Sequence, residues 1–405
     1  MASVRPFKID VPQVKLDRLQ QKLALADFPD EPSHVEPWSR GVPLPTMKQL
    51  VRYWREKYDW RKAEAQLNRF PQYTTQVELD GFGTYNVHFV HRQSEVKNAI
   101  PLLFIHGWPS SFMEAIKILP ELVKGGPEFP AFHVVAPSLM DYGFSDSTRK
   151  RGFGVNEHAE IFNKLMHVLG YNQYVVQAGD VGYLISRFLV QKYPESCRAH
   201  HANMTQPNKP TQEDNPDLFA KMVAIGPTKE DEALLARHGK FFKEEAGYFH
   251  IQSTRPQTIA YSLADSPVGL LAWIYDKLVG LTDDYPFTED EILTWISIHW
   301  FSTAGPGAPP RIYYEFCNKE PTSEIVQSGR WADAPLGVAR FPKEPSNLPK
   351  LWHEGLGPIV QWTEFTRGGH FAAYEMPKEL LAEVRKMYGK DGGAAGIVEG
   401  RSGYD

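Results

Sequence analysis

The sequence predicts an α/β fold in which helices flank a mostly parallel sheet, with a helical lid and an N-terminal wrapping segment. Short apolar strand patterns alternate with helical patterns over 73–209, as in strands joined by crossover helices. Strand patterns fade over 210–330, where helical patterns broken by Gly, Pro and Trp dominate. We therefore expect a wrapping segment over 1–72, the first part of the core over 73–209, a lid over 210–330, and the second part of the core with a flexible tail over 331–405.

The wrapping segment contains two amphipathic helical patterns on either side of a Pro-rich connection. The apolar faces consist of Leu16, Leu19 and Leu23 in the first pattern and Met47, Leu50, Val51 and Trp54 in the second. An apolar face needs a partner to cover it, so we expect both helices to pack onto the main domain.

The core begins with alternation, and residues 77–87 with the pair Asp80-Gly81 predict a hairpin. Further strands are expected at 102–105, 132–136, 174–177 and 336–340, with helices near 157–169 and from Pro377. The Gly-rich stretch from Gly392 predicts the flexible tail.

Composition limits the classes of partner. The 405 residues carry a formal net charge of −5 without a long basic run, so nothing indicates nucleic-acid binding. Cys197 and Cys317 are too few for a disulfide framework or a cysteine metal site, and His200-His201 lacks metal-ligand spacing and is expected to pack after a strand. We expect no metal and no cofactor. Since no segment resembles a signal peptide or a membrane span, we expect a cytoplasmic protein.

The most informative motif is Ala178-Gly179-Asp180-Val181-Gly182, which lies between an apolar strand pattern and a helical one. A sharp strand-to-helix turn crowds the positions two before and two after its central residue, which explains the small Ala178 and Gly182. The side chain at the tip projects outward, so Asp180 is a candidate nucleophile. An ordinary solvated turn is the alternative.

A second loop could supply backbone donors to this turn. Residues 106–109, His-Gly-Trp-Pro, follow the predicted strand at 102–105. Where a nucleophile occupies such a turn, one N–H comes from the residue after it and another from an earlier loop of this kind. We expect the N–H groups of Val181 and Trp108 to form an oxyanion hole, and a tight loop packed by Trp108 is the alternative.

The candidate base is His370, which follows a diglycine and precedes the apolar start of a helix. Its position agrees with the chain order nucleophile, acid, histidine. The acid should follow a strand between them, and Glu344 lies after the predicted strand at 336–340. Other carboxylates in this interval are alternatives: Asp333, Glu354 and Glu364.

With these motifs, the chain resembles the microsomal-type epoxide hydrolases, in the branch that includes soluble fungal enzymes. The resemblance covers nearly the whole chain and rests on the His-Gly-Trp-Pro loop, the Gly-Asp turn and the blocks 247–256, 265–270 and 367–373. It implies the α/β-hydrolase fold, and it implies an acid in a Phe-Pro-x-acid segment, which matches residues 341–344. Microsomal members carry an N-terminal membrane anchor that this chain lacks, so we expect it to resemble the soluble members. The resemblance also suggests a homodimer.

The resemblance assigns two tyrosines that hydrogen-bond the epoxide oxygen. Tyr248 matches the first, in the Gly-Tyr pair of the 247–256 block. The second occurs as Tyr-x-Glu and matches Tyr313, although Tyr314 remains possible. Without the resemblance, lid packing would explain any of the 18 tyrosines.

Together these residues predict an enzyme that converts an apolar epoxide and water to a vicinal diol through an alkyl ester on Asp180. The phenols would assist ring opening, and His370, oriented by Glu344, would activate water. The aromatic residues Phe241, Phe242, Trp273, Trp295 and Trp300 suggest an apolar cavity under the lid. The alternatives are a haloalkane-type dehalogenase, which commonly has Trp where this chain has Val181, and a non-catalytic hydrolase-fold binding protein.

Overall fold

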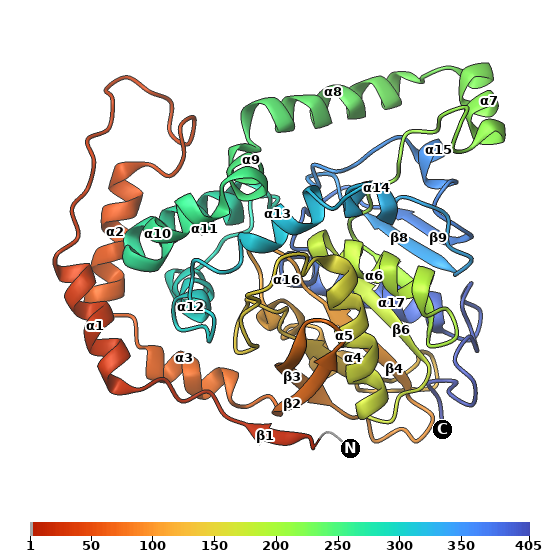
Figure 1. Ribbon diagram of the computed structural model, residues 1–405, viewed down its shortest axis with the longest axis horizontal. Helices are drawn as coiled ribbons and strands as arrows, with labels where there is room; N and C mark the ends of the chain where they lie inside the picture. Colours follow the sequence, from red (N-terminus) through yellow and green to blue (C-terminus); the bar gives the residue numbers. More distant parts are fainter. Residues whose placement is uncertain (1–2) are drawn as a thin grey trace.

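The computed structural model describes residues 3–405, which form one nine-stranded sheet covered by helices (Figure 1). The strand order is β1-β2-β3-β5-β4-β6-β7-β8-β9. Pairs from β1 to β5 along this order are antiparallel, and every pair from β5 to β9 is parallel. The strands are β1 Arg5–Phe7, β2 Gln72–Leu79, β3 Gly83–Arg92, β4 Ile100–Ile105, β5 Phe132–Pro137, β6 Tyr174–Ala178, β7 Cys197–Ala202, β8 Leu336–Arg340 and β9 Ile359–Glu364.

The helices divide among the N-terminal segment, the two parts of the core and the lid. Those of the N-terminal segment and the core are α1 Gln13–Ala24, α2 Leu44–Glu56, α3 Trp60–Leu67, the 3₁₀ helix η1 Phe112–Ala115, α4 Leu119–Leu122, α5 Val155–Val168, α6 Asp180–Lys192, α15 Lys350–His353, α16 Ala372–Glu375 and α17 Pro377–Tyr388. Those within the predicted lid segment are α7 Pro216–Ile225, α8 Lys229–Glu244, α9 Gly247–Thr254, α10 Pro256–Asp265, α11 Pro267–Gly280, α12 Glu289–Trp300, α13 Arg311–Cys317 and α14 Glu324–Ser328.

The elements that the sequence predicted for the core are confirmed. The hairpin is β2–β3, and the predicted strands and helices correspond to β4, β5, β6, β8, α5 and α17. The sequence did not predict β1, α3 or β9, which are short or lie at a sheet edge, where the apolar pattern is weak. His200 and His201 lie within β7 and are fully buried there, so the expectation that they follow a strand was wrong.

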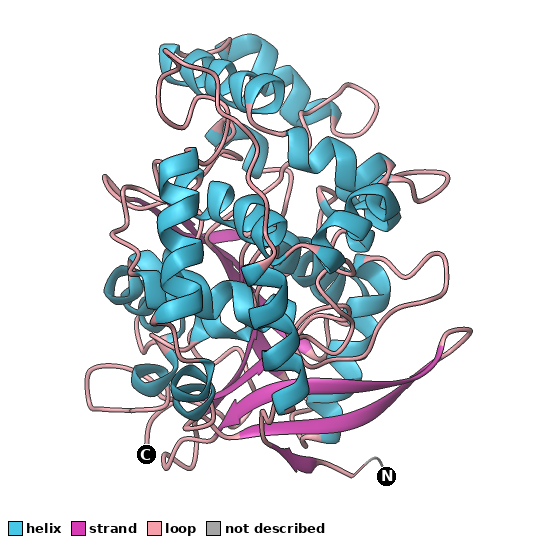
Figure 2. Cartoon of the chain, turned by 90° about the vertical axis from the view of Figure 1, so that its left-hand side faces the viewer, coloured by secondary structure: helices cyan, strands magenta, loops and turns pink. Residues whose placement is uncertain are grey.

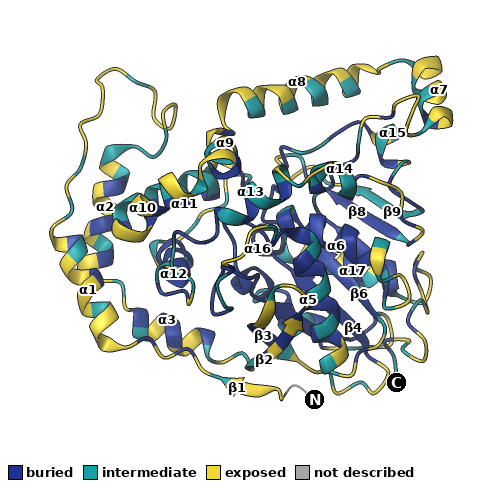
Figure 3. Cartoon of the chain, in the orientation of Figure 1, coloured by how far each residue is buried: buried dark blue, intermediate teal, exposed yellow. Residues whose placement is uncertain are grey.

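The central strands are buried on both faces. In β4, Leu102 and Phe104 join one apolar cluster, whereas Leu103 and Ile105 join the other. This explains the continuous apolar runs of these strands, which are typical of parallel sheets covered on both sides. Figure 3 shows the sheet and α6 largely buried, and α7 and α8 largely exposed.

The sheet topology creates a crevice. β5 lies on one side of β4 and β6 lies on the other, so the chain reverses direction across the sheet at this point. The loops after β4 and β6 therefore diverge at the carboxyl ends of the strands, where open α/β sheets bind ligands.

The N-terminal segment packs differently from the expectation. Instead of covering only the main domain, α1 and α2 contact α11, and α2 and α3 contact α12 of the lid. Lys22 also pairs with Asp265 at 2.5 Å. At the same time, β1 extends the sheet edge beside the β2–β3 hairpin, below the mass of helices (Figure 2). The segment therefore links the lid to the sheet.

The C-terminal tail also differs from the flexible segment that the sequence predicted. Ala394 and Val398 are buried. The Gly403 carbonyl accepts the Ala131 N–H at 2.8 Å, and the Gly403 N–H donates to the Asn98 carbonyl at 2.8 Å. These contacts attach the tail to the core beside β4 and β5. No helix within residues 3–405 has both the length and the apolarity needed to cross a membrane.

A charge at Val398 tests the attachment of the tail. We expect Val398→Asp to lower the free energy of unfolding by about 1–3 kcal/mol, because a buried carboxylate without a partner forces the tail off the core. Calorimetry should therefore record a midpoint several degrees lower. The matched control is Glu399→Ala at the exposed next residue. Equal midpoints for the two variants would contradict the attachment.

Candidate active site

Asp180 occupies the turn between β6 and α6 in a backbone conformation that few non-glycine residues adopt. Its φ of 51° lies in the left-handed region, and such strain persists mainly where the surroundings enforce it. A Cβ at Gly182 would lie 2.3 Å from the Ile105 carbonyl oxygen, and a Cβ at Gly107 would lie 2.2 Å from Asp180 Oδ1. The sequence predicted the crowding at Gly182 because Gly182 belongs to the turn motif itself, but it missed Gly107, which lies in the separate loop after β4.

The loop after β4 supplies a backbone donor. The Trp108 N–H donates to Asp180 Oδ1 at 2.7 Å. Val181 is the second residue of α6, and it lines a cavity that Asp180 also lines. The first four N–H groups of a helix have no partner within the helix and favour negative charge nearby. This end of α6 therefore stabilises the carboxylate together with Trp108.

His370 lies between two carboxylates. Its Nδ1–H donates to Glu344 Oε2 at 2.6 Å, and its Nε2 lies 3.5 Å from Asp180 Oδ2. Glu344 is almost completely buried, and its other oxygen accepts the Ser346 N–H at 2.9 Å. Burial lowers the pKa of His370, but the charges of Glu344 and Asp180 outweigh burial, so the pKa lies well above its ordinary value.

The other candidate acids lie elsewhere. Glu354 pairs with Lys221 at 2.6 Å, and Glu364 accepts from Arg340 at 3.3 Å. Asp333 is exposed. Of the four carboxylates considered from the sequence, Glu344 is the one that contacts His370.

Tyr248 of α9 and Tyr313 of α13 reach the same cavity from the lid. Burial, together with the charge of Asp180, raises the pKa of both phenols well above the ordinary value, so both are O–H donors at neutral pH. Both side chains line this cavity together with Asp180, Glu344 and His370. Tyr314 does not line the cavity.

Comparisons with known proteins agree with this geometry. The family model described as epoxide hydrolase N terminus matches residues 4–115, and the one described as alpha/beta hydrolase fold matches residues 100–257. A putative epoxide hydrolase of Stigmatella aurantiaca (strain DW4/3-1) is 40% identical over 95% of this chain and 84% of its own length. Epoxide hydrolase 1 of Sus scrofa is 32% identical over 96% of this chain and 89% of its own length. The chain belongs to the epoxide hydrolase family.

Solved structures of epoxide hydrolases share the fold. The Aspergillus niger epoxide hydrolase superposes with a TM-score of 0.80 at 30% identity, over 94% of this chain and 95% of that chain. The juvenile hormone epoxide hydrolase of Bombyx mori superposes with a TM-score of 0.85 at 27% identity, over 95% and 93% of the two chains. The predicted family and α/β-hydrolase fold are thus confirmed. The chain is an epoxide hydrolase rather than a dehalogenase or a non-catalytic binding protein.

The cavity of this epoxide hydrolase has a volume of about 180 Å³ and is mostly apolar. Besides the polar groups above, its lining includes Leu184, Met204, Phe241, Phe242, Phe249, Leu281, Phe316 and Ile325. Two of the five lid aromatics that the sequence singled out, Phe241 and Phe242, therefore lie where an apolar substrate would be expected. Trp273, Trp295 and Trp300 do not line the cavity and pack in the apolar cluster instead.

Sequence reasoning missed the groups that hold the histidine loop. The His370 N–H donates to the Leu281 carbonyl at 2.9 Å, and the Gly368 N–H donates to Asp283 Oδ2 at 2.9 Å. From the sheet side, Asn203 Nδ2 donates to the His370 carbonyl at 3.2 Å. Asn203 directly follows β7 at the carboxyl edge of the sheet, and this position could have identified it from the sequence as a site residue. Asp283 had no comparable signal, because its contact joins the lid to a distant loop.

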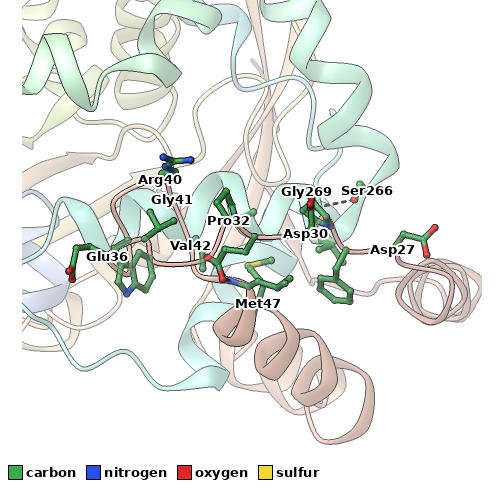
Figure 4. A pocket seen from close by; sticks show the side chains of 18 residues that line it. Asp27, Asp30, Pro32, Glu36, Arg40, Gly41, Val42, Met47, Ser266 and Gly269 are labelled. Carbon is green, nitrogen blue, oxygen red and sulfur yellow. Dashed lines mark hydrogen bonds between the residues drawn. The ribbon is translucent and has the colours of Figure 1, made fainter.

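A larger cavity of about 440 Å³ lies between the N-terminal segment and the start of α11 (Figure 4). The acidic side chains of Asp27 and Glu36 and the apolar side chains of Val42 and Met47 are among those that line it. None of the predicted site residues lines it, so it is separate from the cavity at Asp180.

Neutralising Glu344 tests the electrostatics of this site. In Glu344→Gln we expect the pKa of His370 to fall, because one of the two charges that raise it is lost while the side chain stays buried. Imidazole NMR titration of selectively labelled protein measures this. Asp333→Asn, which neutralises an exposed carboxylate, should leave the pKa unchanged. An unshifted His370 in Glu344→Gln would contradict the attribution.

Proposed function

We propose that this epoxide hydrolase converts an apolar epoxide and water to a vicinal diol through an alkyl ester on Asp180. One observation carries the proposal: the Asp180 carboxylate shares a mostly apolar cavity with two phenols, those of Tyr248 and Tyr313. Opening the ring at carbon needs a nucleophile on one side and donors to the leaving oxygen on the other. A carboxylate opposite two phenols meets both needs, and the apolar lining supports an apolar substrate.

In the first step, Asp180 Oδ2 attacks a ring carbon, because Oδ1 is held by the Trp108 N–H. The bond from Oδ2 to that carbon forms, and the bond from the carbon to the epoxide oxygen breaks. Tyr248 and Tyr313 donate hydrogen bonds to the leaving oxygen, and one of them gives it a proton. The imidazolium of His370 then returns a proton to that phenol through solvent.

In the second step, His370 acts as the base. Esterification removes the charge of Asp180, one of the two carboxylates that raise the pKa of His370, so the imidazolium loses its proton more easily. The neutral ring, oriented by Glu344, takes a proton from water, and the water oxygen bonds to the carboxyl carbon of Asp180. The N–H groups of Trp108 and Val181 stabilise the resulting oxyanion.

Collapse of this intermediate completes the cycle. The bond between the carboxyl carbon and Oδ2 breaks, and the diol leaves with Oδ2 as its second hydroxyl oxygen. The new carboxylic acid of Asp180 gives its proton to the departing alkoxide. The site returns to a carboxylate, two phenols and an imidazolium, so protons and atoms balance.

The cytoplasmic location, the homodimer and the segment boundaries at 72, 209 and 330 stay predictions of the sequence.

Removing the base should trap the ester. In His370→Gln we expect Asp180 to be alkylated and the ester to persist, because no group activates water. After exposure to styrene oxide, intact-protein mass spectrometry should record an adduct of the substrate's mass. Adding Asp180→Asn to this variant should abolish the adduct. A His370→Gln protein that binds styrene oxide without forming an adduct would rule out the ester route.

Removing both phenols should slow the first step alone. In the Tyr248→Phe, Tyr313→Phe double variant we expect alkylation to slow by about 10²–10⁴-fold, because the leaving oxygen loses its donors. Single-turnover stopped-flow measurements give this rate. Tyr261→Phe, at an exposed lid tyrosine, is the control. An unchanged alkylation rate in the double variant would show that both tyrosines only pack in the lid and do not donate to the leaving oxygen.

A further inference from the structure

Lys277 of α11 is a partly buried charged side chain that lies over Tyr248, and the mechanism above does not use it. Its side chain is only 12% exposed. Its Nζ lies over the Tyr248 ring, 5.3 Å from the ring centre. Placing an ammonium at such a site costs hydration free energy, so its position calls for a physical reason.

The contact is one of a pair between α9 and α11. One turn before Lys277, Trp273 Nε1 donates to Gln252 Oε1 at 3.2 Å, and Gln252 lies one turn after Tyr248. Tyr248 and Gln252 are four residues apart on α9, as are Trp273 and Lys277 on α11. The two contacts between these helices therefore lie one helical turn apart. Trp108 also stacks on Tyr248, with ring centres 4.8 Å apart and an angle of 13°. The phenol ring is thus held by both the lid and the loop that binds Asp180.

The positive charge of Lys277 also affects the Tyr248 phenol. The cavity is lined by the carboxylates of Asp180 and Glu344, by His370 between them, and by no lysine or arginine among residues 3–405. Both carboxylates disfavour negative charge on the Tyr248 oxygen. That oxygen gains negative charge when the phenol donates to an opening epoxide, and a cation over an aromatic ring offsets this cost. The ammonium also pairs with the Asp276 carboxylate at 2.8 Å and donates to the Glu245 carbonyl at 3.3 Å.

We propose that Lys277 is a positioning residue that holds and polarises Tyr248, so that this phenol donates more strongly to the epoxide oxygen as the ring opens. The inference rests on the proposed role of Tyr248 as a donor. It assigns Lys277 to the alkylation step and to no other step, because the phenols act only while the epoxide oxygen leaves.

A double-mutant cycle tests this assignment. Single-turnover alkylation by styrene oxide and the later hydrolysis of the ester are measured in four proteins: the wild type, Lys277→Met, Tyr248→Phe and the combination. We expect Lys277→Met to slow alkylation about tenfold when Tyr248 is present. With Phe at position 248, the same change should alter alkylation less than about twofold. Ester hydrolysis should stay within about twofold throughout.

Two further variants separate charge from packing. Lys277→Arg keeps the cation over the ring and should alkylate within about threefold of the wild type. Lys240→Met removes a lysine that is 68% exposed on α8, and it should leave both rates unchanged. If circular dichroism finds Lys277→Met unfolded, Lys277→Gln replaces it under the same criteria.

The possible failures are distinguishable. The inference is overturned if Lys277→Met alkylates at the wild-type rate, or if it slows alkylation equally with Tyr and with Phe at position 248. It is also overturned if ester hydrolysis slows as much as alkylation, since that result indicates a general loss of structure. If Tyr248→Phe itself alkylates at the wild-type rate, the proposed donor role of Tyr248 fails first, and the role of Lys277 fails with it.

Discussion

The left-handed turn at Asp180 is the constraint on which the rest of the site depends. A non-glycine residue with a φ of 51° costs free energy, about 1–2 kcal/mol, that the surrounding packing must supply. Here β4 and β6 are adjacent parallel strands, with Ile105 opposite Ala178, so the loop after β4 passes directly over the turn. Gly107 and Gly182 allow this close approach, and the Trp108 N–H then binds the carboxylate. The strained turn at Asp180, the close approach of the loop after β4 and the Trp108 donor therefore depend on one another.

This arrangement concentrates negative charge in a mostly apolar cavity, and that charge raises the pKa of the titratable groups around it. The carboxylates of Asp180 and Glu344 raise the pKa of His370 despite its burial, which favours an imidazolium between them. Burial, together with the charge of Asp180, raises the pKa of Tyr248 and Tyr313, which keeps both phenols protonated. One electrostatic environment thus supplies a nucleophile, proton donors and a histidine whose pKa depends on the charge of Asp180.

The lid belongs to the same framework. It carries both phenols, and its Leu281 and Asp283 also accept hydrogen bonds from the loop that presents His370. The N-terminal segment contacts α11 and α12 and continues into the sheet edge through β1. A displacement of α11 would therefore alter both Tyr248, which Lys277 contacts, and the loop that presents His370, whose N–H donates to Leu281. This coupling explains how a site built from distant segments of the chain keeps a single geometry.

The sequence by itself determined the fold class, most core strands and the candidate residues whose signals are local. A nucleophile turn, a Gly-containing loop and a diglycine-histidine motif each occupy a few consecutive residues, so a short pattern suffices to find them. The tertiary structure decided which distant groups meet them. It brought Glu344 rather than three other carboxylates to His370, and Tyr313 rather than Tyr314 to the cavity.

The same physical reason explains the features that the sequence missed or misjudged. The contact of Gly107 with Asp180, the anchoring of the histidine loop by Asn203 and Asp283, and the place of Lys277 over Tyr248 all join segments far apart in the chain. The docking of the Gly-rich tail depends on backbone partners at Asn98 and Ala131, which precede β4 and β5 and come together only after folding. Local composition specifies turns and apolar faces, whereas long-range packing specifies which of them come together.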